Sequence, residues 1–139
     1  MAKKKLLVFH LDIAPYRVDL WNELNNEFAA NFYYFRRNVR NHRFDMRAIL
    51  DQLNFNPNFF TCGFELYYKG RMVRFGYLKK IIKHRPDIII NLEFSPITIV
   101  TLLFSNLFFP HTKVYSICDD SLDISKNCSG LRLLARSFA

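Results

Sequence analysis

The chain has 139 residues, half of them hydrophobic and only 4 of them glycine, which is the composition of a globular domain and excludes a disordered segment. This length supports one ordinary hydrophobic core, so we expect a single domain over residues 1–139. Lys and Arg number 20 against 12 Asp and Glu, and the net charge of +8 favours an anionic partner without choosing between nucleic acid, a membrane surface and an acidic substrate.

The first predicted elements are a buried strand over residues 6–9, which are all apolar, and an amphipathic helix over residues 18–28. Trp21 lies on the apolar face of this helix and is expected in the core. The loop from Asp12 to Arg17 joins the two elements at the carboxyl end of the strand, where open α/β sheets bind ligands. Two places for Arg17 stay open: contact with an anionic group, or a solvent-facing position in the first helical turn.

The same loop lacks the glycines of a dinucleotide-binding fingerprint, because Ala14, Pro15 and Tyr16 stand at those positions. A pyrophosphate therefore cannot lie against the backbone there as it does in dinucleotide-binding folds. His10 ends the first strand. We interpret it as a core histidine with satisfied hydrogen bonds, with a position facing the ligand crevice as the alternative.

The next segment combines an aromatic strand over residues 31–35 with a cluster of arginines. These arginines are Arg36, Arg37, Arg40, Arg43 and Arg47. We interpret the cluster as a solvated loop. Anionic lipid headgroups and then nucleic acid are the alternatives, and we do not expect nucleic acid as a partner. Weak helical periodicity follows over residues 44–53 and a short strand over residues 59–62, while residues 63–74 receive no assignment.

The last part of the chain repeats the alternation of helix and strand. Helices are predicted over residues 76–84 and 97–109, and strands over residues 87–91 and 113–117. The helix over residues 97–109 is too short to cross a bilayer and is expected to pack on the sheet. The alternation predicts a three-layer α/β fold of Rossmann-like type with a mostly parallel sheet. Residues 131–139 begin a helix without a stop signal, which favours a truncated protein.

Polar side chains follow three of the predicted strands, at carboxyl ends that converge on one crevice in such a sheet. They are Asp12 to Arg17 after the first strand, Glu93 and Ser95 after the fourth, and Asp119, Asp120 and Ser121 after the last. Carboxylates after the last strand suit a metal ion or a general base, and helix capping is the alternative. The four histidines show no metal-ligand spacing. The scattered residues Cys62, Cys118 and Cys128 form neither a disulfide framework nor a zinc site, and together with the absence of a secretory signal they favour a cytoplasmic protein.

Three segments, in this order, carry a resemblance to a known family: APYRVDLWNEL at residues 14–24, HRPDIII at residues 84–90 and YSICDDS at residues 115–121. Together they resemble the N-terminal domain of GT-B glycosyltransferases, most closely the group 1, or family 4, type. The resemblance implies two Rossmann-like domains. The N-terminal one binds the acceptor, and a C-terminal donor-binding domain is absent from this chain. It also implies no metal and no cofactor, because the nucleotide-sugar is a substrate.

The resemblance implies a role for each matching residue. Pro15, Tyr16 and Arg17 match the loop that approaches the acceptor and the donor phosphates. Asp119 and Asp120 match a catalytic region in which many members have His-Asp, although Cys118 here replaces the histidine. We expect Glu93, Ser95 and Ser121 to bind substrate.

The expected function is transfer of a sugar to a saccharide or a lipid-linked acceptor in polysaccharide or glycolipid biosynthesis, at the inner membrane face. The chain alone is expected to be inactive. A non-catalytic, flavodoxin-like α/β binding domain is the alternative.

Overall fold

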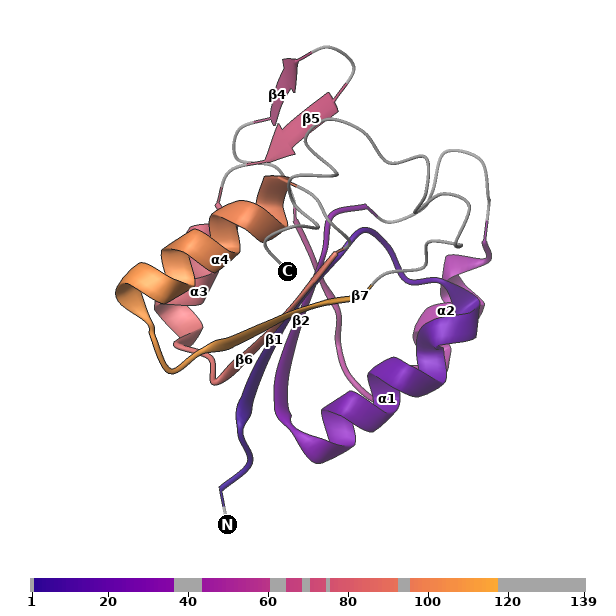
Figure 1. Cartoon of the computed structure of the whole chain (residues 1–139). Helices are drawn as coiled ribbons and strands as arrows, with labels where there is room; N and C mark the ends of the chain where they lie inside the picture. The colour runs from indigo at the N-terminus through magenta and orange to yellow at the C-terminus, as the bar shows by residue number, and fades with distance from the viewer. Residues whose placement is uncertain are drawn as a thin grey trace, which may run out of the picture.

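A five-stranded, all-parallel sheet forms the middle layer of the domain (Figure 1). The computed structural model describes residues 2–36, 44–60, 65–68, 71–74, 76–92 and 96–117. The strands, in their order across the sheet, are β3 (Asn58–Phe59), β2 (Ala29–Tyr34), β1 (Lys5–His10), β6 (Ile88–Leu92) and β7 (Lys113–Ile117). This architecture confirms the predicted three-layer, Rossmann-like α/β class.

The central strand β1 explains the continuous apolar run at the start of the sequence. It pairs with β2 on one side and β6 on the other, and residues 6–9 are fully buried. Leu6 and Val8 belong to the hydrophobic core on one face of the sheet, and Leu7 and Phe9 belong to the core on the other. A strand that is covered on both faces has no polar side, so its sequence does not alternate.

Helices cover both faces of the sheet (Figure 1). After the short 3₁₀ turn η1 (Pro15–Arg17), helices α1 (Val18–Glu27) and α2 (Met46–Asp51) pack on the face of Leu6 and Val8. Helices α3 (Tyr77–His84) and α4 (Pro96–Phe108) pack on the face of Leu7 and Phe9. Helix α3 ends as predicted just before Pro86, where Arg85 adopts a left-handed conformation with φ of 44°.

The stretch that the sequence left unassigned contains an antiparallel pair of strands, β4 (Glu65–Tyr68) and β5 (Arg71–Arg74). Strand β2 begins two residues earlier than predicted, at Ala29. Of the predicted strand over residues 59–62, Phe59 belongs to β3, while residues 61 and 62 lie outside the described part of the chain. The predicted helix over residues 131–139 also lies outside it.

Trp21 organises the core under α1. Its indole is fully buried, and its ring centroid lies 6.0 Å from that of Phe32 and 6.3 Å from that of Tyr34, both in edge-on arrangements. The ring of His10 lies 5.3 Å away. Edge-on aromatic contacts add to the energy of apolar burial. Trp21 is therefore the core residue that the sequence predicted, and it joins α1 to the ends of β1 and β2.

Replacing Trp21 by alanine is expected to lower the free energy of unfolding by about 3–5 kcal/mol, because it would leave a cavity and remove the ring contacts with Phe32, Tyr34 and His10. The neighbouring Leu20 is the matched control, since its side chain is 43% exposed. Leu20→Ala is expected to change the stability by about 0.5 kcal/mol or less. Urea unfolding followed by circular dichroism measures both, and equal losses in the two variants would contradict the packing described.

Candidate functional site

The carboxyl edge of the sheet is the natural place for a ligand. All five strands run in parallel, so all their carboxyl ends lie at this edge. Across the sheet the order is β3, β2, β1, β6 and β7. From β1 the chain first adds strands on one side, β2 and β3, and then on the other side, β6 and β7, so the direction reverses between β1 and β6. In doubly wound folds the ligand crevice forms at such a reversal. The segment that follows β1 therefore borders the candidate site.

Three of the predicted site residues belong to the described part of the chain: Pro15, Tyr16 and Arg17. The others follow β6 and β7 directly in the sequence and lie outside the described residues. They are Glu93, Ser95, Asp119, Asp120 and Ser121. The structure thus describes one of the three predicted clusters of site residues. That the three clusters converge on one crevice stays a prediction.

The loop after β1 combines a buried base with an exposed tip. Ile13 and Ala14 are buried, and the backbone N–H of Arg17 donates to the carbonyl of Ala14 at 3.0 Å. Pro15 and Tyr16 are exposed, Tyr16 with 76% of its surface. Proline suits the first position of the 3₁₀ turn because its missing N–H would be unpaired there. The tyrosine ring is therefore held in solvent on an anchored turn.

Arg17 is buried under this tip, which contradicts the solvent-facing alternative. Its Nη1 lies 2.7 Å from Nε2 of His10, and Nδ1 of the same ring lies 2.9 Å from the carbonyl oxygen of Asp12. Arginine only donates hydrogen bonds, so Nε2 accepts and Nδ1–H donates to the carbonyl. His10 is thus a buried histidine with both nitrogens bonded, as expected from the sequence. Its role is to hold a guanidinium at the carboxyl edge of the sheet.

The guanidinium of Arg17 also lies near an aromatic face, with its central carbon 5.8 Å from the ring centroid of Tyr16. This distance is within the range of a cation–π contact. The exposed ring and the buried cation therefore form one unit, with an apolar surface outside and a positive charge directly beneath it.

Tyr34 is the second polar group that the fold places here, and the sequence reading missed it. It ends β2 and is the register partner of His10 on β1, so the two side chains lie on the same face. The side chain is fully buried, and among the described residues its hydroxyl has no hydrogen-bond partner. Burial and the charge of Asp12 raise the pKa of Tyr34 far above its usual range. The phenol therefore stays protonated and is a hydrogen-bond donor.

Removing this hydroxyl by Tyr34→Phe is expected to leave the free energy of unfolding unchanged or to raise it by up to about 1 kcal/mol, because an unpaired buried hydroxyl is costly. The neighbouring Tyr33 is the matched control, since its hydroxyl lies 2.9 Å from Nε2 of His84. Tyr33→Phe is expected to cost about 1 kcal/mol. Thermal and urea unfolding of the two variants tests this difference. A loss in Tyr34→Phe as large as in Tyr33→Phe would contradict it.

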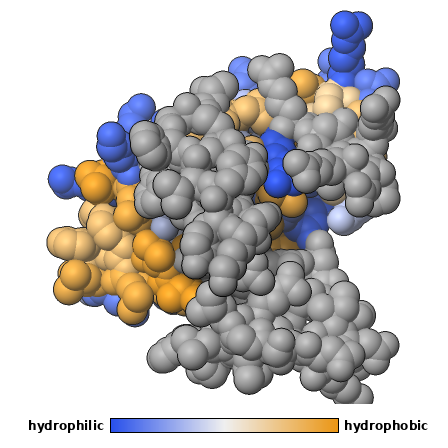
Figure 2. Space-filling model, turned by 90° about the horizontal axis from the view of Figure 1, so that it is seen from above, coloured by the Kyte–Doolittle hydropathy of each residue, from blue (hydrophilic) through white to orange (hydrophobic). Residues whose placement is uncertain are grey.

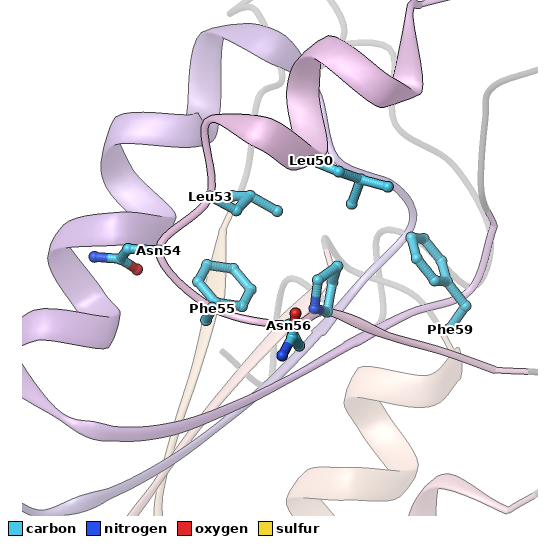
Figure 3. Close-up of a pocket in the computed structure, with 7 residues that line it drawn as sticks. Leu50, Leu53, Asn54, Phe55, Asn56 and Phe59 are labelled. Carbon is cyan, nitrogen blue, oxygen red and sulfur yellow. The ribbon is translucent and has the colours of Figure 1, made fainter.

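A separate depression, with a volume of about 490 Å³, lies between the end of α2 and β3 (Figure 3). It is lined by Leu50, Leu53, Asn54, Phe55, Asn56, Pro57 and Phe59. In Figure 3 the amide of Asn54 points away from the depression, toward α1, where it bonds to Asn22 and Asn26. This amide is therefore occupied in joining two elements. A depression with so few polar groups to orient a ligand is a weaker candidate than the carboxyl edge.

Two features are absent from the described part of the chain, a metal-binding cluster and a membrane-spanning helix. No three side chains of His, Cys, Asp or Glu come together there in a group able to hold a metal ion. Within the same residues no helix is both long and apolar enough to cross a membrane.

Neither models of known protein families nor curated proteins match this sequence. The fold class therefore rests on the structure itself. The resemblance to GT-B glycosyltransferases stays a prediction.

Proposed function

We propose that this chain is the acceptor-binding domain of a glycosyltransferase that moves a sugar from a nucleotide-sugar to a saccharide or lipid-linked acceptor. One observation supports the proposal most directly. The exposed ring of Tyr16 lies over the buried guanidinium of Arg17 at the reversal point of a parallel sheet. Ligand crevices form at such points. An aromatic ring beside a fixed cation suits a ligand that joins a sugar ring to a phosphate.

Each group has a distinct role in this proposal. The face of Tyr16 packs against the apolar face of an acceptor sugar. Arg17, held in place by His10, supplies a positive charge near the phosphate groups of a lipid-linked acceptor or of the donor. Tyr34 keeps a buried, protonated hydroxyl within the electrostatic influence of Asp12, beneath the loop and out of direct contact with substrate. By the resemblance, Asp119 or Asp120 orients the acceptor hydroxyl. Glu93, Ser95 and Ser121 contact substrate in this proposal because they follow the carboxyl ends of β6 and β7.

The exposed tyrosine provides a direct test of acceptor binding. Tyr16→Ala is expected to weaken the binding of a polyprenyl-diphosphate-linked saccharide by about tenfold, the loss that corresponds to about 1.4 kcal/mol of contact energy. Tyr115→Ala is the matched control, because Tyr115 is an exposed tyrosine on β7, outside the loop. Titration calorimetry in detergent micelles measures both. Equal affinities of native chain and Tyr16→Ala would remove the loop from the binding site.

The proposal also makes a prediction about turnover. The isolated chain of 139 residues is expected to transfer no sugar from any nucleotide-sugar, because by the resemblance the donor is bound by a second domain. Release of nucleoside diphosphate in a coupled assay measures this. Sugar transfer by the isolated chain would contradict its assignment as an acceptor half. Saccharide binding without any transfer by a protein that contains both halves would favour a non-catalytic binding domain.

A further inference from the structure

Helix α4 exposes a row of large apolar side chains, although other apolar residues of the same helix pack on the core. Thr98, Thr101 and Ser105 recur at helical spacing and are buried against the sheet. Half a turn away, Val100, Leu103 and Leu107 recur at the same spacing and are exposed, the two leucines with 67% and 74% of their surfaces. A helix on the surface of a globular protein normally buries its apolar face. The exposed face of α4 therefore needs a reason other than the core.

The part of the sheet beneath α4 is also polar. Asn91 on β6 and Ser116 on β7 are register partners on the α4 face, and among the described residues their buried polar atoms have no hydrogen-bond partner, nor do the hydroxyls of Thr101 and Ser105. Thr98 at the start of the helix donates through its hydroxyl to the carbonyl of Leu92 at 2.7 Å. The hydroxyl side of α4 thus packs over a polar part of the sheet. The apolar residues on the other side of the helix stay in solvent.

The exposed apolar surface continues from α4 onto α3, and Figure 2 shows it as the orange area at the left with hydrophilic residues beside it. Ile82 of α3 is half exposed, as is Phe108 at the end of α4. Helix α4 carries no charged residue over its full length. The two helices share one core through Leu78 and Phe104, so their outer surfaces form a single face. We call it the α3–α4 face.

Charge is distributed unevenly around this domain. Segments 76–92 and 96–117, which build the α3–α4 side, contain five Lys or Arg and a single aspartate, Asp87. Lys79 and Lys83 are exposed on α3. On the opposite face, α1 contains Asp19, Glu23 and Glu27 and no Lys or Arg. An anionic surface would therefore attract the α3–α4 side and repel the α1 side.

We propose that the α3–α4 face binds the surface of an anionic lipid bilayer. Val100, Leu103 and Leu107 enter the boundary between headgroups and acyl chains, and the lysines of α3 contact the headgroups. The length of α4, 13 residues, suits a helix that lies in the interface plane rather than one that crosses it. This inference does not depend on sugar transfer, because it concerns another part of the surface and a ligand without saccharide.

The apolar contact is tested by co-sedimentation with vesicles of phosphatidylcholine containing about one-third phosphatidylglycerol. The native chain is expected to bind these vesicles and to bind vesicles of phosphatidylcholine alone at least about tenfold more weakly. The double variant L103Q/L107Q is expected to lose about tenfold or more in affinity. Leu20→Gln is the matched control, because Leu20 is an exposed leucine on the acidic helix α1 and its replacement should leave binding unchanged.

The electrostatic contact is tested without touching any apolar side chain. Lys79→Glu lowers the charge of α3 by two units. Near an anionic surface each unit of charge changes the affinity about fivefold, so an affinity loss of about 25-fold is expected. Arg47→Glu makes the same change on α2, on the other face of the sheet, and is expected to stay within about threefold of the native chain. Circular dichroism establishes that each variant is folded. If L103Q/L107Q does not fold, the comparison of Lys79→Glu with Arg47→Glu decides.

Four results would overturn the proposal. These are no vesicle binding by the native chain, equal binding to neutral and anionic vesicles, native affinity in the folded α4 or Lys79 variants, and an equal loss in the Leu20 or Arg47 controls. A dimer in lipid-free solution that L103Q/L107Q abolishes would instead assign the face to a second copy of this chain. None of these results depends on saccharide binding, so they leave the acceptor proposal to its own test.

Discussion

The burial of β1 on both faces is the constraint on which the rest of the structure depends. Residues 6–9 form the contact between two separate cores, and the strand bonds to β2 and β6 on its two edges. Because both partners run parallel to β1, every crossover returns to the same end of the sheet. The loop after β1 therefore lies at the reversal of strand order. Its exposed tip and its buried arginine follow from this position.

Much of the fold could be predicted because its signals are local. The apolar run of β1 and the spacing of apolar residues in α1 and α3 identify elements that one core or the other buries. Strands β4 and β5 were missed because each has only four residues, too few for a clear periodic pattern. The helix predicted over residues 97–109 packs on the sheet as expected, and the spacing of Thr98, Thr101 and Ser105 marks the side that it buries. That spacing does not reveal that the sheet beneath is polar.

The site could be predicted only in part. The tip of the loop, with Pro15 and Tyr16, follows from its place between a strand and a helix. The burial of Arg17 depends on the end of β1, where His10 projects toward it. The role of Tyr34 depends on the register of β1 and β2, which aligns it with His10. Register is set by contacts between residues far apart in the sequence, so no local pattern contains it.

The hydrogen bonds of His10 have a consequence for the chemistry of this edge. The hydrogen bond at one nitrogen of an imidazole sets the tautomer and therefore what the other nitrogen can bind. Here Arg17 occupies one nitrogen and the carbonyl of Asp12 occupies the other. The ring therefore acts as a spacer whose orientation is fixed at both nitrogens. A substitution that removes this imidazole would therefore release the arginine side chain from its place at the exit of β1.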